Sequence, residues 1–327
     1  MTEFHGGDLA DASARFGEPA NGWVDLSTGI NPWPWPVEGD RLADLHRLPE
    51  RGDLDRLRAA AASAYGINDP ARIVVAPGTQ ALIQWLPRLR SPEKVSVLAP
   101  TYGEHAPAWR LAGHKIAEVL SLPEAEDQSV VVLTRPNNPD GAVCAETDLR
   151  NLAAELHRKE GWLVIDEAFA DLDPRPSVAA DLDLGTIALR SFGKFYGLPG
   201  LRLGFAIADA DTAQKLSEAL GPWPVSTLAA RVGAAALSDS DWQTDTRKRL
   251  VAAGQRLDDM IVGAGMGIVG GTDLFRLAQS DIAAEIFDHL GDYGIYARRF
   301  PENDRWLRFG LPGPEQHWDR LAAALPS

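Results

Sequence analysis

The stretch Thr186-Ile-Ala-Leu-Arg-Ser-Phe-Gly-Lys194, continued by Gly197-Leu-Pro-Gly-Leu-Arg202, joins a short apolar run to a glycine-rich segment that carries a lysine and an arginine. The run over 186–189 is apolar on both faces, which predicts a buried strand. Glycines let the backbone approach a ligand closely, and a hydroxyl beside a guanidinium suits a phosphate. A lysine held beside such a phosphate can form an imine with an aldehyde cofactor, although a lone lysine at a strand end is ordinarily a surface residue.

Further apolar runs extend the same pattern along the chain. They lie at 72–76, 95–99, 130–133, 163–165 and 203–208, with helical patterns over 54–65, 81–89 and 146–159 between them. Strands that alternate with helices predict an α/β fold with a mostly parallel sheet covered by helices on both faces.

The pattern changes after residue 210. Helical sequence dominates to 263, and a short segment of mixed α and β character runs from 267 to 311. We therefore expect an N-terminal arm over 1–40 that joins the smaller domain and a large domain over 41–210. Residues 211–327 should form an interdomain helix and a smaller α+β C-terminal domain.

Composition excludes several classes of protein. The 327 residues include 32 Lys and Arg against 46 Asp and Glu, a net charge of −14. Such a charge repels nucleic acid and anionic membranes, so neither is an expected partner, and an anionic ligand would need a local basic pocket. No apolar run approaches the ~20 residues that span a bilayer, and the acidic N-terminus does not resemble a signal peptide. With Cys144 as the sole cysteine, disulfides are excluded and a cytoplasmic location is expected.

Polar residues follow three of the other predicted strands. Asp166 directly follows one strand, where a carboxylate points into the crevice in which such folds bind ligands. Asn138 lies in the proline-rich turn after another strand, and Gly78 and Thr79 precede a helix, where anions bind readily. Taken singly, these features could be a helix cap, a plain turn and an N-cap. No metal site is predicted, because no metal-ligand spacing occurs among His46, His105, His114, His157, His289 and His317.

Taken together and in order, these residues make the chain resemble the aminotransferase class I/II family of fold type I pyridoxal-phosphate enzymes over nearly its whole length. The residues that carry the resemblance are Gly78-Thr79-Gln80, Tyr102, Asn138, Asp166, Lys194 and Arg202. It implies a large domain with a sheet of the seven-stranded type, pyridoxal 5'-phosphate as the cofactor, and a homodimer.

Shorter motifs are most similar to those of the threonine-phosphate decarboxylases of cobalamin biosynthesis, and next to those of the histidinol-phosphate aminotransferases. These motifs are His5-Gly-Gly-Asp8, Asp25-Leu-Ser-Thr-Gly-Ile-Asn-Pro32 and Trp306-Leu-Arg-Phe-Gly-Leu-Pro312. One position departs from the pattern, because Phe169 stands where the family often has a tyrosine that bonds the ring oxygen of the cofactor.

The resemblance implies a role for each residue around the cofactor ring. Lys194 would form the imine and later move the proton, and Asp166 would pair with the protonated pyridine nitrogen. Asn138 would donate to the ring oxygen, and Tyr102 would stack on the ring face. The cofactor phosphate would be held by Gly78, Thr79, Gln80, Ser191 and Arg202. Tyr65 resembles the tyrosine that reaches the cofactor phosphate of the partner subunit.

The resemblance also implies a substrate site. Arg308 matches the arginine that holds the substrate α-carboxylate through two parallel hydrogen bonds, which lysine does poorly. Arg298 and Arg299 are candidates for binding a substrate phosphate, because a doubly anionic group in so acidic a protein requires local cations. The backbone around His5 and Gly6 is expected to close over that phosphate, and Asn31 is a further candidate substrate ligand.

The reaction stays open between two outcomes. The same lysine, aspartate and arginine serve decarboxylation and transamination, so these residues do not separate the two. The short motifs and Phe169 favour decarboxylation of L-threonine O-3-phosphate, a phosphorylated amino acid, to aminopropanol phosphate. The alternative is an aminotransferase of the histidinol-phosphate type.

Overall fold

A computed structural model of the chain describes residues 6–125, 128–182 and 185–325. The contacts between its Cα atoms divide the chain into two compact units. The larger unit comprises Trp35–Asn138 and Ala142–Gln243. The smaller unit comprises the residues up to Pro34, Pro139–Gly141, and the residues from Thr244 onward.

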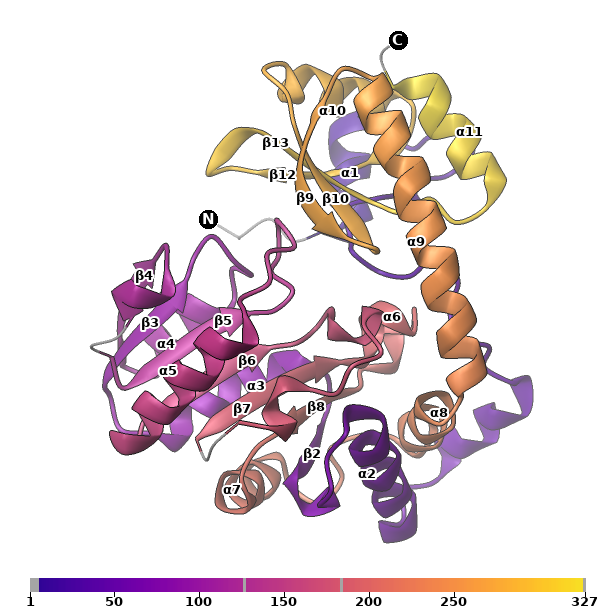
Figure 1. Cartoon of the computed structure of the whole chain (residues 1–327). Coiled ribbons are helices and arrows are strands. Elements are labelled where there is room, and N and C mark those ends of the chain that lie inside the picture. Colours follow the sequence, from indigo (N-terminus) through magenta and orange to yellow (C-terminus); the bar gives the residue numbers. More distant parts are fainter. Residues whose placement is uncertain (1–5, 126–127, 183–184, 326–327) are drawn as a thin grey trace. The chain divides into compact units, whose positions relative to one another are not determined.

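Within the described residues, the larger unit has a seven-stranded sheet in the order β2-β8-β7-β6-β5-β3-β4 (Figure 1). Its strands are β2 (Ile73–Ala76), β3 (Lys94–Leu98), β4 (Lys115–Val119), β5 (Val130–Thr134), β6 (Trp162–Asp166), β7 (Thr186–Ser191) and β8 (Gly204–Ile207). Neighbours from β4 to β7 pair in parallel, and β8 is antiparallel to both of its neighbours. The structure confirms the predicted α/β fold with a mostly parallel sheet. Strand β4 was not predicted, because charged residues interrupt its apolar pattern.

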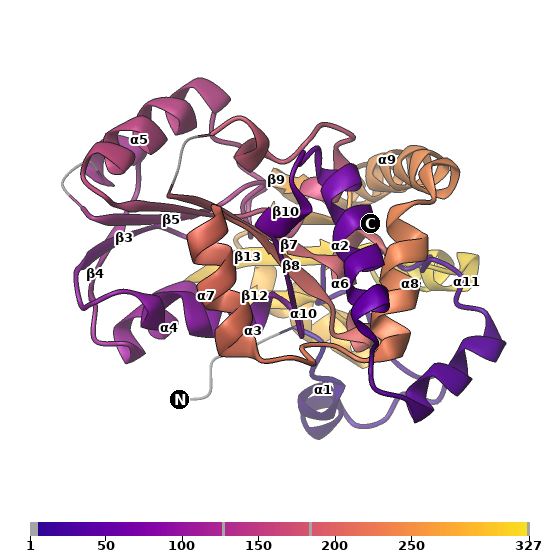
Figure 2. The ribbon, with the colours of Figure 1, turned by 90° about the horizontal axis from the view of Figure 1, so that it is seen from below.

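Helices cover both faces of this sheet (Figure 2). They are α2 (Arg51–Tyr65), α3 (Thr79–Trp85), α4 (His105–Leu111), α5 (Glu146–Arg158), the short α6 (Phe192–Phe195), α7 (Ala210–Leu220) and α8 (Thr227–Leu237). Alternate residues of a strand point to opposite faces, so Val130 and Val132 pack with α3, α4 and α7, whereas Val131 and Leu133 pack with α5. Burying one such side chain stabilises the fold by ~1.5–3 kcal/mol.

The smaller unit is built around a four-stranded antiparallel sheet in the order β12-β13-β10-β9 within the described residues. The strands are β9 (Gly267–Thr272), β10 (Phe275–Gln279), β12 (Arg298–Phe300) and β13 (Asn303–Gly310), and a separate parallel pair joins β1 (Val24–Asp25) to β11 (Ile295–Tyr296). The helices are α1 (Leu9–Phe16), α9 (Ser240–Gly263), which begins in the larger unit, α10 (Ala283–Asp292) and α11 (Glu315–Ala324). Helix α1 is attached to α10 by Phe16, whose ring lies 5.7 Å from that of Phe287.

The boundary between the units lies at Thr244 and not at residue 211, where the sequence analysis placed it. Helix α7 belongs to the larger unit because Ala213 and Leu216 are part of the apolar core on one face of the large sheet. Helix α8 packs against α2, and a Cβ at Gly233 would lie 2.9 Å from a methyl carbon of Leu57. No helix in the described part of the chain combines the length and apolarity needed to cross a membrane.

Candidate active site

The residues predicted to hold the cofactor gather along one edge of the large sheet. Asp166 ends β6 and pairs in register with Thr134 at the end of β5. Ser191 at the end of β7 pairs with Gly204, which also pairs with Ala76 at the end of β2. Because these strands end at the same edge, the loops beyond them start beside one another. On or beside these loops lie Gly78, Thr79, Gln80, Tyr102, Asn138, Asp166, Ser191, Lys194 and Arg202.

The carboxylate of Asp166 is buried, with 3% of the residue exposed. Its Oδ1 accepts the backbone N–H of Ala168 at 3.0 Å, and its Oδ2 lies 2.9 Å from Nε2 of His105. An ionised carboxylate can only accept hydrogen bonds, so the imidazole donates through Nε2. His105 is itself buried, and this charge-assisted bond fixes the orientation of the carboxylate.

His105 was not among the predicted site residues. It stands three residues after Tyr102, and the two rings meet edge to face with centroids 6.0 Å apart. Tyr102 also donates to Oε1 of Gln80 at 3.4 Å, and the amide nitrogen of Gln80 donates to Glu104 at 2.7 Å. No local signal could have identified it, because its partner Asp166 lies 61 positions away in the sequence.

The loops after β3 and β5 are locked together by side chains next to the predicted site residues. The hydroxyl of Thr101 donates to Oδ1 of Asn137 and lies 2.8 Å from the hydroxyl of Thr134. Asn137 donates in turn to the carbonyl of Pro100 at 2.9 Å. This network fixes the backbone beside Tyr102 and beside Asn138, so both residues start from defined positions.

The turn at Gly78 lies directly against Arg202. Gly78 has φ +81°, and a Cβ there would lie 2.6 Å from Nη2 of Arg202. A Cβ at Gly204 would lie 2.6 Å from the backbone nitrogen of Thr79, so glycine is required on both sides of this contact. The arrangement offers a guanidinium, backbone N–H groups and the hydroxyls of Thr79 and Ser191 along the same sheet edge, which is the donor set that a phosphate needs.

Lys194 lies on α6, directly after β7, and its ammonium faces an aromatic ring. Its Nζ is 5.6 Å from the ring centroid of the buried Phe169. A cation over a ring face is stabilised by ~0.5–2 kcal/mol. Phe169 therefore contacts the lysine but has no hydroxyl to donate to a cofactor.

Tyr65 is not placed where the sequence analysis put it. It continues the buried face of α2, after Leu57 and Ala61, and its hydroxyl is enclosed within its own subunit. The guanidinium of Arg190 lies 4.4 Å from its ring centroid, and burial raises the pKa of Tyr65 well above its usual value. An enclosed hydroxyl cannot reach a second subunit, so the predicted contact with the partner's cofactor is wrong.

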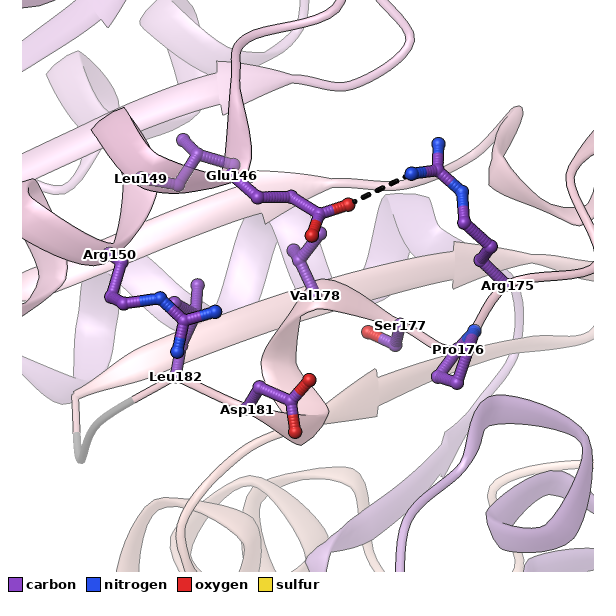
Figure 3. A pocket seen from close by; sticks show the side chains of 9 residues that line it. All are labelled: Glu146, Leu149, Arg150, Arg175, Pro176, Ser177, Val178, Asp181 and Leu182. Carbon is purple, nitrogen blue, oxygen red and sulfur yellow. Dashed lines mark hydrogen bonds and ion pairs between the residues drawn. The ribbon is translucent and has the colours of Figure 1, made fainter.

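A cavity of about 110 Å³ elsewhere on the larger unit contains none of the predicted site residues (Figure 3). Its lining comes from the start of α5 and from the segment 175–182. Glu146 and Arg175 form an ion pair of 3.2 Å there. The cavity is therefore separate from the sheet edge that carries the cofactor residues.

In the smaller unit, Arg308 of β13 is buried with 4% of its surface exposed. Its Nη2 donates to the carbonyl oxygen of Ser27 at 2.8 Å, and its guanidinium lies 5.0 Å from the ring centroid of Phe275. Burial, and then the charge of Arg298, lower the pKa of Arg308 to about 9, whereas Asp25 raises it. Because the guanidinium charge is costly in this position, an anion bound there would be stabilising.

The two candidate phosphate-binding arginines lie on opposite faces of β12. Arg298 pairs across the ladder with Arg308, so their side chains share one face. Arg299 points to the other face, where its guanidinium lies 4.4 Å from the ring centroid of Phe287 on α10. Burial, and then Arg15, lower the pKa of Arg299. Of the two candidates for the substrate phosphate, Arg299 therefore does not share a face with Arg308, the expected ligand of the substrate carboxylate, and we retain Arg298.

The N-terminal candidates lie close to Ser27. A Cβ at Gly6 would lie 2.3 Å from the carbonyl oxygen of Ser27, the same oxygen that Arg308 contacts. Asn31 is buried, and its Oδ1 accepts the backbone N–H of Trp33 at 2.9 Å, so that oxygen already serves a turn. His5 lies outside the described residues.

Comparisons with known proteins show the family and the fold. The family model described as "Aminotransferase class I and II" matches residues 42–325. A threonine-phosphate decarboxylase of Pseudomonas aeruginosa is 43% identical over 98% of this chain and 96% of its own length. Another threonine-phosphate decarboxylase, from a Sinorhizobium species, is 40% identical over 98% of this chain and 97% of its own length. The structure of a histidinol-phosphate aminotransferase from Sinorhizobium meliloti in complex with pyridoxal-5'-phosphate has the same fold, with a TM-score of 0.82 and 22% identity over 99% and 95% of the two chains.

The role of His105 can be tested with His105→Phe, which removes the donor to Asp166. Hydrogen bonds to charged groups are worth ~1.5–3 kcal/mol, so we expect the dissociation constant for pyridoxal phosphate to rise roughly 10- to 100-fold. Titration of the apoprotein, followed by absorbance, measures this constant.

The matched control is His114→Phe. His114 is also buried, and its ring bonds to the backbone of Glu93 and Pro87 at 3.1 and 2.8 Å. We expect this variant to lose stability but to keep its affinity for the cofactor. Equal losses of affinity in both variants would show that His105 has no special role.

Proposed function

The chain belongs to the aminotransferase class I and II family, and on that premise we propose that it is a pyridoxal-phosphate-dependent threonine-phosphate decarboxylase. It converts L-threonine O-3-phosphate to aminopropanol phosphate and carbon dioxide, for the nucleotide loop of cobalamin. The observation that carries this conclusion is the 40–43% identity, over nearly the full length, with two decarboxylases of that name. Histidinol-phosphate aminotransferases are less similar to this chain, at 28–30% identity.

The residues at the sheet edge fit the cofactor. The close contact between Gly78 and Arg202 would hold its phosphate, and the buried carboxylate of Asp166 would hold the proton of its pyridine nitrogen. When bound, pyridoxal phosphate supplies an electron sink for the bond at Cα that is held perpendicular to its ring. His105 keeps Asp166 oriented for this pairing by donating to its other side.

Lys194 is the residue that we propose carries the cofactor and moves the proton. Loss of the substrate carboxylate as carbon dioxide leaves an electron pair at Cα, and Nζ of Lys194 then delivers a proton to that carbon. The ring of Phe169 lies beside this nitrogen, with its centroid 5.6 Å from Nζ.

Arg308 and Arg298 are the proposed substrate ligands. A guanidinium matches a carboxylate with two parallel hydrogen bonds, and Arg308 is held ready by the carbonyl of Ser27. Arg298, on the same face of the sheet as Arg308, supplies the second positive charge that a phosphorylated substrate requires. A buried and a half-buried arginine on one face suit a substrate with two anionic groups.

A homodimer is also part of the proposal. Besides the family membership, it is supported by Leu45, Leu48 and Trp223, which are each more than half exposed on the larger unit. Their segments are neighbours, because the hydroxyl of Thr227 donates to the carbonyl of Arg47 at 2.7 Å. Sedimentation equilibrium should give twice the 35.4 kDa chain mass, and a fully active monomer would contradict it.

We also place the enzyme in the cytoplasm. Its sole cysteine, Cys144, leaves it without the disulfides that are common in secreted proteins. Fractionation of the source cells, with the protein followed by antibody, tests this location.

The reaction is tested with two substrates on the holoenzyme. With L-threonine phosphate, we expect carbon dioxide and aminopropanol phosphate without any keto acid. With histidinol phosphate and 2-oxoglutarate, we expect no glutamate. Glutamate in the second mixture, without carbon dioxide in the first, would assign an aminotransferase instead.

The two arginines of β12 give a matched pair of variants. Arg298→Ala should lower kcat/KM for threonine phosphate relative to that for unphosphorylated threonine. The difference corresponds to a loss of ~1.5–3 kcal/mol in transition-state stabilisation, because charge-assisted bonds to the phosphate are lost. Arg299→Ala should lower the thermal stability but leave this preference unchanged, since its side chain packs on Phe287. If Arg299→Ala alone lost the preference for threonine phosphate over threonine, Arg299 and not Arg298 would be the phosphate ligand.

A further inference from the structure

Ser27 of the smaller unit is fully buried, and its polar groups contact three separate segments. Its hydroxyl accepts the backbone N–H of Gly7 at 2.7 Å and donates to Oδ1 of Asp25 at 2.6 Å. Its own N–H donates to the same carboxylate oxygen at 2.9 Å, and its carbonyl accepts from Arg308 at 2.8 Å. One residue thus connects the N-terminal segment, β1 and β13.

The N-terminal segment is fitted closely against Ser27. A Cβ at Gly6 would lie 2.3 Å from the carbonyl oxygen of Ser27, a separation that no side chain tolerates. Gly7 has φ +90°, a conformation that favours glycine, and its N–H points at the Ser27 hydroxyl. The segment therefore packs against the residue that holds Arg308.

The same residue organises the charges around Arg308. The carboxylate of Asp25 attracts the guanidinium and opposes the effects of burial and of Arg298. Two hydrogen bonds from Ser27 hold this carboxylate, and the Ser27 carbonyl holds the guanidinium directly. A displacement of Ser27 would therefore disturb both the acceptor of Arg308 and its attracting charge.

We propose that Ser27 is a positioning residue that couples the docking of Gly6 and Gly7 to the orientation of Arg308. The proposal rests on the proposed function only in that Arg308 binds the substrate carboxylate. With Gly6 and Gly7 docked, the carbonyl of Ser27 holds Arg308 in its binding orientation. When they leave, the Ser27 hydroxyl loses its donor and Arg308 is less well held.

The coupling between Gly6 and Arg308 through Ser27 can be disrupted at Ser27 or at Gly6. Ser27→Ala removes the hydroxyl, and Gly6→Ala places a Cβ against the Ser27 carbonyl. The readout is the rate at which Arg308 reacts with phenylglyoxal in the holoenzyme without substrate, followed by peptide mass spectrometry. We expect both variants to raise this rate roughly 5- to 10-fold, as the loss of one hydrogen bond predicts.

Three internal controls separate a specific link from general loosening. Ser13→Ala removes another serine hydroxyl of the same unit, which accepts from Trp23 at 2.9 Å, and Gly263→Ala adds a methyl group where no atom lies within 4 Å. Neither should change the reactivity of Arg308. Arg299, on the other face of the sheet, should react at the wild-type rate in all four variants.

The proposal is overturned if Ser27→Ala and Gly6→Ala leave Arg308 at its wild-type rate, or if Arg299 becomes reactive to the same extent. In a parallel assay, both variants should raise KM for threonine phosphate, again roughly 5- to 10-fold. The labelling needs no turnover. It therefore tests the link even if the wild-type enzyme fails to decarboxylate threonine phosphate, the result that would refute the proposed function alone.

Discussion

The carboxylate of Asp166 is buried at the carboxyl end of β6, where a charge needs donors to compensate its lost hydration. His105 and the backbone of Ala168 supply two of them. The larger unit places these groups: parallel strands bring Asp166 and Ser191 to one edge, and the segment beyond β3 brings His105 to the same carboxylate, with the ring of Tyr102 against that of His105. A site that stabilises a protonated ring nitrogen needs such a buried, oriented anion.

The smaller unit meets the opposite electrostatic problem. The chain carries a net charge of −14, yet Arg298 and Arg308 lie opposite each other on one face of its sheet. Like charges in that arrangement repel, and the repulsion is relieved when an anion binds. This electrostatic cost suits a site that binds a doubly anionic substrate. The fully buried Ser27 is the residue that we propose keeps such a site in order.

Much of the fold of the larger unit could be predicted from the sequence, because its strands are marked by short apolar runs. Val130 to Leu133 are apolar on both faces, and the polar residues that follow each strand predicted the cofactor site. The features that could not be predicted depend on the direction in which individual side chains point. Arg298 and Arg299 are equivalent as neighbours in sequence, but a strand sends them to opposite faces. Tyr65 was misplaced because its role was carried over from the family, although its spacing from Leu57 and Ala61 marks the buried face of α2. His105 bonds to a residue 61 positions away, a contact that no local pattern shows.

The central claim is that the sheet edge with Asp166 holds pyridoxal phosphate on Lys194. Reduction of the holoenzyme with borohydride, digestion and peptide mass spectrometry test it most directly. The account predicts loss of the yellow colour and a stable cofactor adduct on the peptide containing Lys194, with none on the other lysines. An adduct on a different lysine, or a colourless protein that takes up no added cofactor, would contradict it.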